Sequence, residues 1–219
     1  MPRNYLQMAI GSFAMSLCLA SLPQAADAVP FNNATGLASP GATIDFSEVV
    51  LPQDTPLGAS FAAYGVTFSN LFYDTSYNGS FPNTSGAAAV NFTGNGAGIL
   101  NPFSINFLTA VTEAAFALVT QPSATPTVIQ TFLAGTLVES QNVFANLIDP
   151  TNFYGFTGSS FDQIVVNVSA GVNEAALIDN LQFTAAATAV PEPATLALFG
   201  AGLAGLGALR RRRKAKAHA

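Results

Sequence analysis

Carboxylates are the only charged side chains in the central part of this sequence. Residues 29–189 contain ten Asp and Glu residues and no Lys, Arg, His or Cys. Catalysis by an activated Ser or Cys needs a basic partner, and zinc, copper and haem sites need His or Cys ligands, so neither chemistry fits this region. Carboxylates alone can still supply the acid and base of a glycosidase, or oxygen ligands for Ca²⁺.

The glycosidase is the remote alternative. The region has no cation to separate the pKa values of two acids, and the chain has no Trp to hold a sugar ring. We therefore predict that the protein is not an enzyme.

Four oxygen-bearing residues are candidates for calcium binding. Asp45 and Glu48 lie near the first predicted strand, and Asp179 and Asn180 lie near the last. The terminal strands of a β-sandwich often pair, which would bring these side chains around one ion. The alternative, which is preferred, is that they are solvated residues at strand ends.

Two tyrosines are candidates for contact with a sugar. Tyr73 and Tyr77 lie in residues 72–80, a segment that combines aromatic rings with hydrogen-bonding side chains. Aromatic rings and a few polar groups are the usual lining of a small-ligand site. Alternatively, these tyrosines only cover the edge of the core.

The segments that position these residues are short, rich in β-forming residues and separated by Gly, Pro, Asn and Ser, a pattern typical of an all-β sandwich. Half of the chain is apolar (50%), which favours a packed core. We expect one β-sandwich domain at residues 29–184 and a linker at 185–189. The predicted strands are 43–51, 64–73, 87–92, 103–108, 113–120, 127–139, 141–147, 153–157, 162–170 and 175–183.

Positive charge is confined to the two ends of the sequence. The seven basic residues are Arg3 and six residues between positions 210 and 216, so the central domain is a polyanion. Binding to nucleic acid requires Lys or Arg against phosphate, and we therefore expect no nucleic-acid partner.

The N-terminus has the pattern of a secretory signal peptide, predicted at residues 1–28. Arg3 precedes an apolar stretch at residues 8–22, and Ala26 and Ala28 provide the small residues that a signal peptidase recognises. Cleavage is expected after Ala28. A lipoprotein site at Cys18 is disfavoured because Leu17, rather than a small residue, precedes the cysteine.

The C-terminus, residues 190–219, combines three features. A proline-rich motif at 190–195 overlaps an uncharged apolar segment at 194–209, and a basic cluster follows at 210–216. As a helix the apolar segment would be roughly 24 Å long, which is marginal for a bilayer core of about 30 Å. We predict a single transmembrane helix whose cytoplasmic end is fixed by Arg210, Arg211, Arg212, Arg213 and Lys214.

This tail resembles the sorting tail of the PEP-CTERM proteins of Gram-negative bacteria. In that family an exosortase, a membrane-embedded cysteine protease-like enzyme, recognises the tail and removes it. The resemblance implies that Pro191, Glu192 and Pro193 are recognition residues and that the precursor is tethered to the inner membrane. It implies a final location at the cell surface or in the extracellular matrix.

The body is similar to jelly-roll domains that resemble galactose-binding and carbohydrate-binding modules. Four segments carry this resemblance: Ile44-Asp45-Phe46, Gly65-Val66-Thr67-Phe68, Phe161-Asp162-Gln163-Ile164-Val165 and the run from Ile178 to Phe183. We expect an exported structural or adhesive protein linked to exopolysaccharide. A lectin-like carbohydrate-binding module is the alternative.

Overall fold

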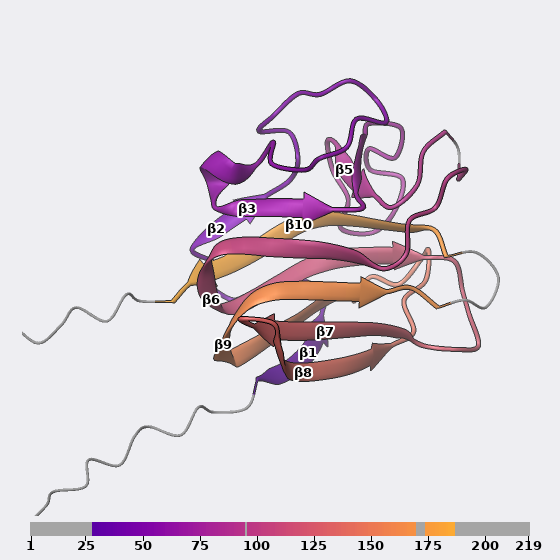
Figure 1. Cartoon of the computed structure of the whole chain (residues 1–219). Coiled ribbons are helices and arrows are strands. Elements are labelled where there is room, and N and C mark those ends of the chain that lie inside the picture. Colours follow the sequence, from indigo (N-terminus) through magenta and orange to yellow (C-terminus); the bar gives the residue numbers. More distant parts are fainter. Residues whose placement is uncertain (1–27, 95, 170–173, 187–219) are drawn as a thin grey trace, which may run out of the picture.

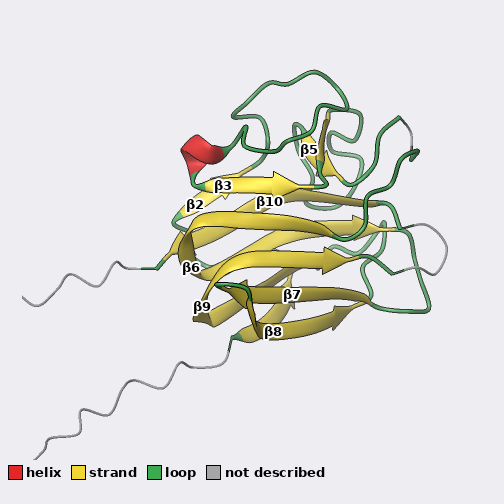
Figure 2. Ribbon diagram, viewed as in Figure 1, coloured by secondary structure: helices red, strands yellow, loops and turns green. Residues whose placement is uncertain are grey.

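The computed structural model describes residues 28–94, 96–169 and 174–186, and in these segments the chain is all-β (Figure 1 and Figure 2). The single helical element described is a 3₁₀ turn, η1 (Ala62–Tyr64). The strands are β1 (Val29–Asn33), β2 (Ala42–Ile44), β3 (Val66–Ser69), β4 (Phe72–Asp74), β5 (Ala88–Val90), β6 (Phe103–Thr120), β7 (Thr127–Leu133), β8 (Thr136–Val143), β9 (Phe153–Asn167) and β10 (Ala176–Ala185).

Several sequence predictions fall outside these segments. The predicted signal peptide, apart from Ala28, and the predicted transmembrane helix at residues 194–209 are not among the described residues. Within the described segments, no helix has the length and apolar character needed to cross a membrane. The first residue of the predicted linker, Ala185, is the last residue of β10.

Two long strands connect the halves of one antiparallel sheet. β6 has 18 residues and β9 has 15, and their pairing shifts register between Asn106 and Glu113. Extra residues on one strand of a pair bend it and increase its twist, and Figure 1 shows both strands curving through the sheet. One half has the order β3-β6-β9-β7-β8, and the other has the order β4-β5-β10-β6-β9-β1, with β2 also on β10.

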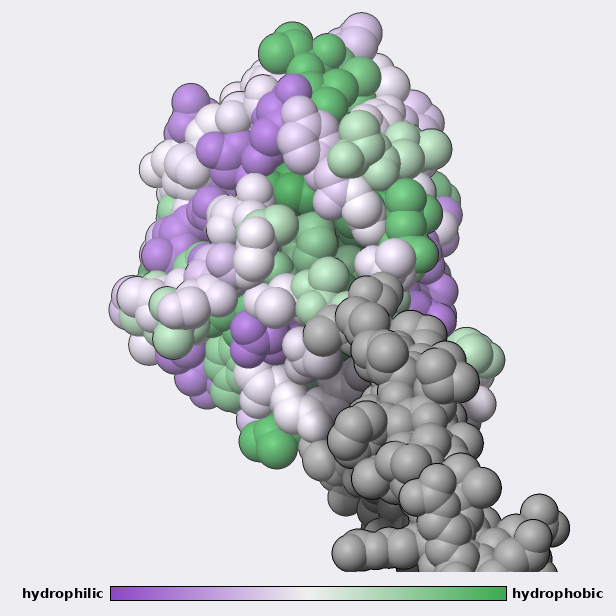
Figure 3. Space-filling model, turned by 90° about the vertical axis from the view of Figure 1, so that its left-hand side faces the viewer, coloured by the Kyte–Doolittle hydropathy of each residue, from purple (hydrophilic) through white to green (hydrophobic). Residues whose placement is uncertain are grey.

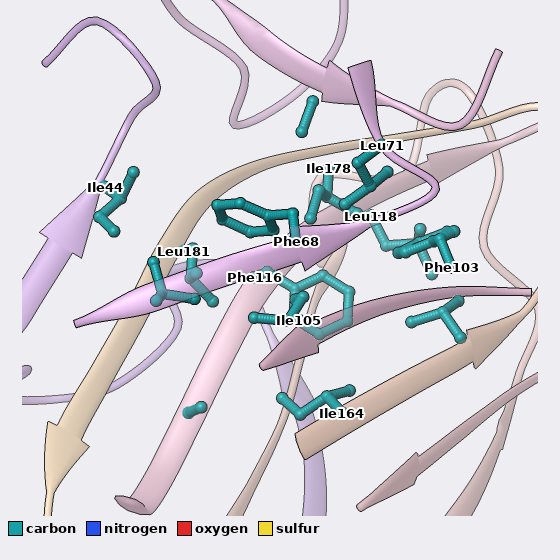
Figure 4. Packing of buried hydrophobic residues seen from close by; sticks show 14 of the residues in the cluster. Ile44, Phe68, Leu71, Phe103, Ile105, Phe116, Leu118, Ile164, Ile178 and Leu181 are labelled. Atoms are coloured by element: carbon teal, nitrogen blue, oxygen red, sulfur yellow. The ribbon is translucent and has the colours of Figure 1, made fainter. Parts of the chain in front are cut away.

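The inner faces of the two halves meet in one hydrophobic core. Ile105 and Ile164 come from the first half, and Phe116 and Ile178 come from the second; all four are fully buried in the same cluster (Figure 4). Side chains alternate between the faces of a strand, so each half contributes every second residue to this core. The arrangement is consistent with a β-sandwich.

The second half of β6 is buried on both faces. Phe116 points into the main core, whereas Ala117 belongs to a separate cluster with Phe153. Val119 belongs to a third cluster, which contains Phe92 and is covered by loops on the outer face of the sheet. The outer face near the end of β6 is therefore an apolar surface under loops, and this is where the candidate site lies.

The structure corrects several predicted strand boundaries. Residues 103–108 and 113–120 are parts of one strand, as are 153–157 and most of 162–170, because the bends leave the strand continuous. Residues 127–139 are two strands joined at Ala134 and Gly135, both with positive φ (49° and 79°), as a tight hairpin turn requires. β1, which pairs with β9, is not in the predicted set.

Candidate functional site: an aromatic pocket and a buried acid

A pocket of about 170 Å³ opens on the outer face of the sheet, where the end of β6 and the start of β10 meet three loops. The loop after β4 contributes Tyr77 and Phe81, and the loop after β5 contributes Phe92. Leu147 follows β8, and Leu177 belongs to β10. The pocket therefore depends on segments that are far apart in the sequence.

One wall of the pocket is aromatic. The rings of Tyr77 and Phe81 are stacked, with centroids 5.8 Å apart and an interplanar angle of 30°. Phe92 meets Tyr77 edge to face at 6.1 Å and 81°. These are favourable arrangements for aromatic pairs, and they fix the Tyr77 ring against a base formed by buried Val119 and Leu177.

The polar groups of the pocket are few and uncharged. Thr120 Oγ1 donates to the backbone oxygen of Ala145 at 2.9 Å and lies 3.2 Å from the backbone oxygen of Gln121, so its proton is already engaged. The Tyr77 hydroxyl and the exposed Gln121 amide have no hydrogen-bond partner among the described residues. Burial raises the pKa of the Tyr77 hydroxyl, and the nearby carboxylate of Asp74 raises it further, so this group stays a neutral donor and acceptor.

Tyr73 does not share this pocket with Tyr77. It is 3% exposed and belongs to the main core, whereas its neighbour Phe72 packs against the outer cluster. Successive residues of a strand point to opposite faces, and in β4 this places the Tyr73 ring inside the molecule. The prediction that Tyr73 offers a ring face to a sugar is therefore wrong, and Phe81, Phe92 and Gln121 are the pocket residues that sequence reasoning missed.

The four residues considered for calcium lie where β2 and the loop after it meet β10, a region called the seam below. The carboxyl of Asp179 is buried with 0% exposure, and it accepts backbone hydrogen bonds from Ser85 (2.7 Å) and Asn180 (2.6 Å). Asp45 and Glu48 lie near enough to affect its charge. The pairing of β2 with β10 thus brings these acids near one another.

The seam has protein partners for its polar groups. Glu48 Oε1 accepts the Asp45 N–H at 3.1 Å, and the Asn180 side chain donates to the Asn83 backbone oxygen at 2.8 Å. Within the described segments, no group of three or more His, Cys, Asp or Glu residues is arranged to hold a metal ion. The arrangement gives no support to a calcium site.

Burial raises the pKa of Asp179 to about 7. The two backbone hydrogen bonds lower it, and the charges of Asp45 and Glu48 raise it again, with burial the largest effect. A raised carboxyl pKa is a property of many catalytic acids. Asp179 is nevertheless fully buried, and no carboxylate is among the residues that line the aromatic pocket.

Comparison with known proteins identifies the tail. Residues 189–213 match the model of the PEP-CTERM protein-sorting motif. The match contains Pro191, Glu192 and Pro193 and the arginines at 210–213, and it confirms the resemblance seen in the sequence for this part of the chain. The motif implies an exported protein that is processed by an exosortase. A comparison with curated proteins finds no match.

Proposed function

We propose that this protein is a non-catalytic structural or adhesive component of the cell surface or the extracellular matrix, associated with exopolysaccharide. The observation that supports the proposal is the match of residues 189–213 to the PEP-CTERM protein-sorting motif, next to an all-β body. In this proposal the tail first holds the precursor in the inner membrane of a Gram-negative bacterium. Exosortase cleavage then frees the body on the outer side.

Charge gives this cleavage a physical consequence. Removing the signal peptide and the tail removes all seven basic residues and leaves ten carboxylates. The processed body is then a polyanion, which stays soluble and is repelled by anionic lipid and by nucleic acid. The part of the surface visible in Figure 3 agrees with a soluble body, because its apolar residues form separate groups among polar ones.

Mass spectrometry of the protein from its native host tests the sorting step. We expect a chain that begins at Val29, ends near Pro191 and lacks the basic cluster at 210–216. Replacing both Pro191 and Pro193 by Ala should leave an uncleaved, membrane-bound precursor, whereas Pro122→Ala, a change at an exposed loop proline, should be processed normally. An intact basic cluster in the extracellular protein would contradict the proposal.

The second candidate function is carbohydrate binding of the lectin type. The aromatic pocket around Tyr77 favours it, because aromatic walls with a few neutral polar groups are suited to sugar rings. A glycan array probed with the processed protein tests this candidate, and a silent array would leave the structural or adhesive role alone. The glycosidase is not favoured, because no carboxylate lines the pocket.

A further inference from the structure

The aromatic pocket has room for a single ring. A cavity of about 150 Å³ in another protein is large enough to bind benzene, and the pocket here measures about 170 Å³. A single six-membered ring can therefore enter the pocket. The pocket mouth includes exposed Gln121, so the remaining units of a longer chain can extend into solvent.

The wall of the pocket is prepared for stacking. The Tyr77 ring is held by Phe81, which stacks on it, and by Phe92, with which it makes a T-shaped contact, so little side-chain freedom remains to be lost when a ligand binds. The polar groups then distinguish between kinds of ring. A hydrocarbon ring would remove the Tyr77 hydroxyl from water without a partner, which is unfavourable. A sugar has an apolar face for the wall and hydroxyl groups for Tyr77 and Gln121.

The charges of the body also restrict which sugars can bind in the pocket. No Lys, Arg or His is present in the body, so an acidic sugar has no cation to pair with. Asp74 lies near enough to raise the pKa of Tyr77. A uronic acid would therefore meet like charge and lose hydration without compensation.

We infer that the pocket formed by Tyr77, Phe81, Phe92, Gln121 and Leu177 is a binding site for one neutral hexopyranose unit of a polysaccharide. This inference rests on the carbohydrate-binding candidate and names its ligand class and its location. It makes Tyr77 the stacking residue and Gln121 the hydrogen-bonding residue at the mouth.

Saturation-transfer-difference NMR on the processed protein from the native host tests the inference. The probes are the methyl glycosides of glucose, galactose and mannose, the methyl glycoside of glucuronic acid, and p-cresol as an apolar ring. We expect at least one neutral glycoside to bind and the glucuronide not to bind. Binding of the glucuronide as tightly as the neutral sugars, or binding of p-cresol alone, would overturn the inference.

Substitutions of pocket residues test whether the sugar binds in this pocket. Tyr77→Ala should weaken it about tenfold or more, because an aromatic anchor is lost. Gln121→Ala should weaken it about three- to tenfold, the effect of one lost hydrogen bond. The second change is at an exposed residue and should not affect folding. Tyr64→Ala, a change at an exposed tyrosine of η1, is the control and should bind normally, with thermal melting to verify the fold of all three.

The glycan array separates two kinds of failure. If array binding persists in Tyr77→Ala and Gln121→Ala, the protein binds carbohydrate elsewhere and only the pocket assignment is overturned. If the array and the NMR probes are all silent, carbohydrate binding itself is overturned. Neither result affects the sorting proposal, which mass spectrometry tests independently.

Discussion

Replacing Asp179 by Asn should change how the stability of the body depends on pH. Asp179 is fully buried, and its pKa is raised from 3.8 to about 7 in the folded protein. Because the folded-state pKa is above the unfolded one, the protonated acid favours folding. Its contribution is complete below about pH 4 and is lost as pH rises to about 7.

The pKa difference sets the size of this effect. A tenfold change in proton affinity is worth about 1.4 kcal/mol, so raising the pKa to about 7 corresponds to at most about 4 kcal/mol. The Asn variant has no such proton to lose. Its NH₂ group, however, must face one of the two backbone N–H donors from Ser85 and Asn180, and it cannot accept that hydrogen bond. The loss should lower the free energy of unfolding of the variant by about 1–2 kcal/mol at every pH.

Urea unfolding between pH 4.5 and 8.5, followed by far-UV circular dichroism because the chain has no Trp, measures both proteins. At low pH the wild type should be the more stable. The free-energy difference between wild type and Asp179→Asn should then fall by up to about 4 kcal/mol as pH rises.

Glu139→Gln, a change at a partly exposed acid of β8, controls for the general repulsion among carboxylates. Its stability curve should run parallel to that of the wild type. The reasoning would be refuted if the difference in free energy of unfolding between the wild type and Asp179→Asn stayed constant across this pH range.

Three further predictions concern positions where the structure tolerates little change. Asn180→Ala should lower the free energy of unfolding by about 1–3 kcal/mol in urea titrations, because Asn180 has φ 49° and donates to the Asn83 carbonyl, whereas Asn180→Gly should lose less through backbone strain. Gly155→Ala should lower the free energy of unfolding by about 2–4 kcal/mol or prevent folding, since the new Cβ would lie 2.4 Å from a backbone oxygen. The control is Gly41→Ala, where that distance is 3.4 Å and the expected loss is under about 1 kcal/mol. Equal melting temperatures for the two variants would contradict this prediction. Phe116→Ala should cost about 3–5 kcal/mol by opening a cavity in the main core, which thermal unfolding would detect as a lower Tm, and a loss below about 1 kcal/mol would contradict the packing.

Much of the fold class could be predicted from the sequence. Alternation in β-prone runs such as residues 164–168 and 179–183 reflects one buried and one less buried face, which is a local property. The continuity of β6 and β9 could not be predicted, because a bulge and a loop between two strands both interrupt the alternation of buried and exposed residues. At Leu108 and Thr109 exposure interrupts the pattern although the strand continues.

The candidate site likewise contains residues that could be predicted from the sequence and residues that could not. Tyr77 could be found because it lies in a loop rich in aromatic and hydrogen-bonding residues. Phe92 and Leu177 could not be assigned to it, since their partners are set by the pairing of β5 and β10. Tyr73 lies in the same aromatic and hydrogen-bonding segment, but only the packing of β4 shows that its ring faces the main core.

The sequence by itself determined the charge separation, the sorting motif and the absence of basic side chains from the body, because these depend only on which residues are present and in what order. The tertiary structure alone decided which aromatic rings surround a pocket and which acid is buried. Both depend on contacts between segments distant in sequence: Tyr77 meets the start of β10 at the pocket, and Asp179 meets Ser85 at the seam. Burial, hydrogen bonding and pKa are properties of these contacts, and they arise only when the two halves of the sheet and their covering loops pack together.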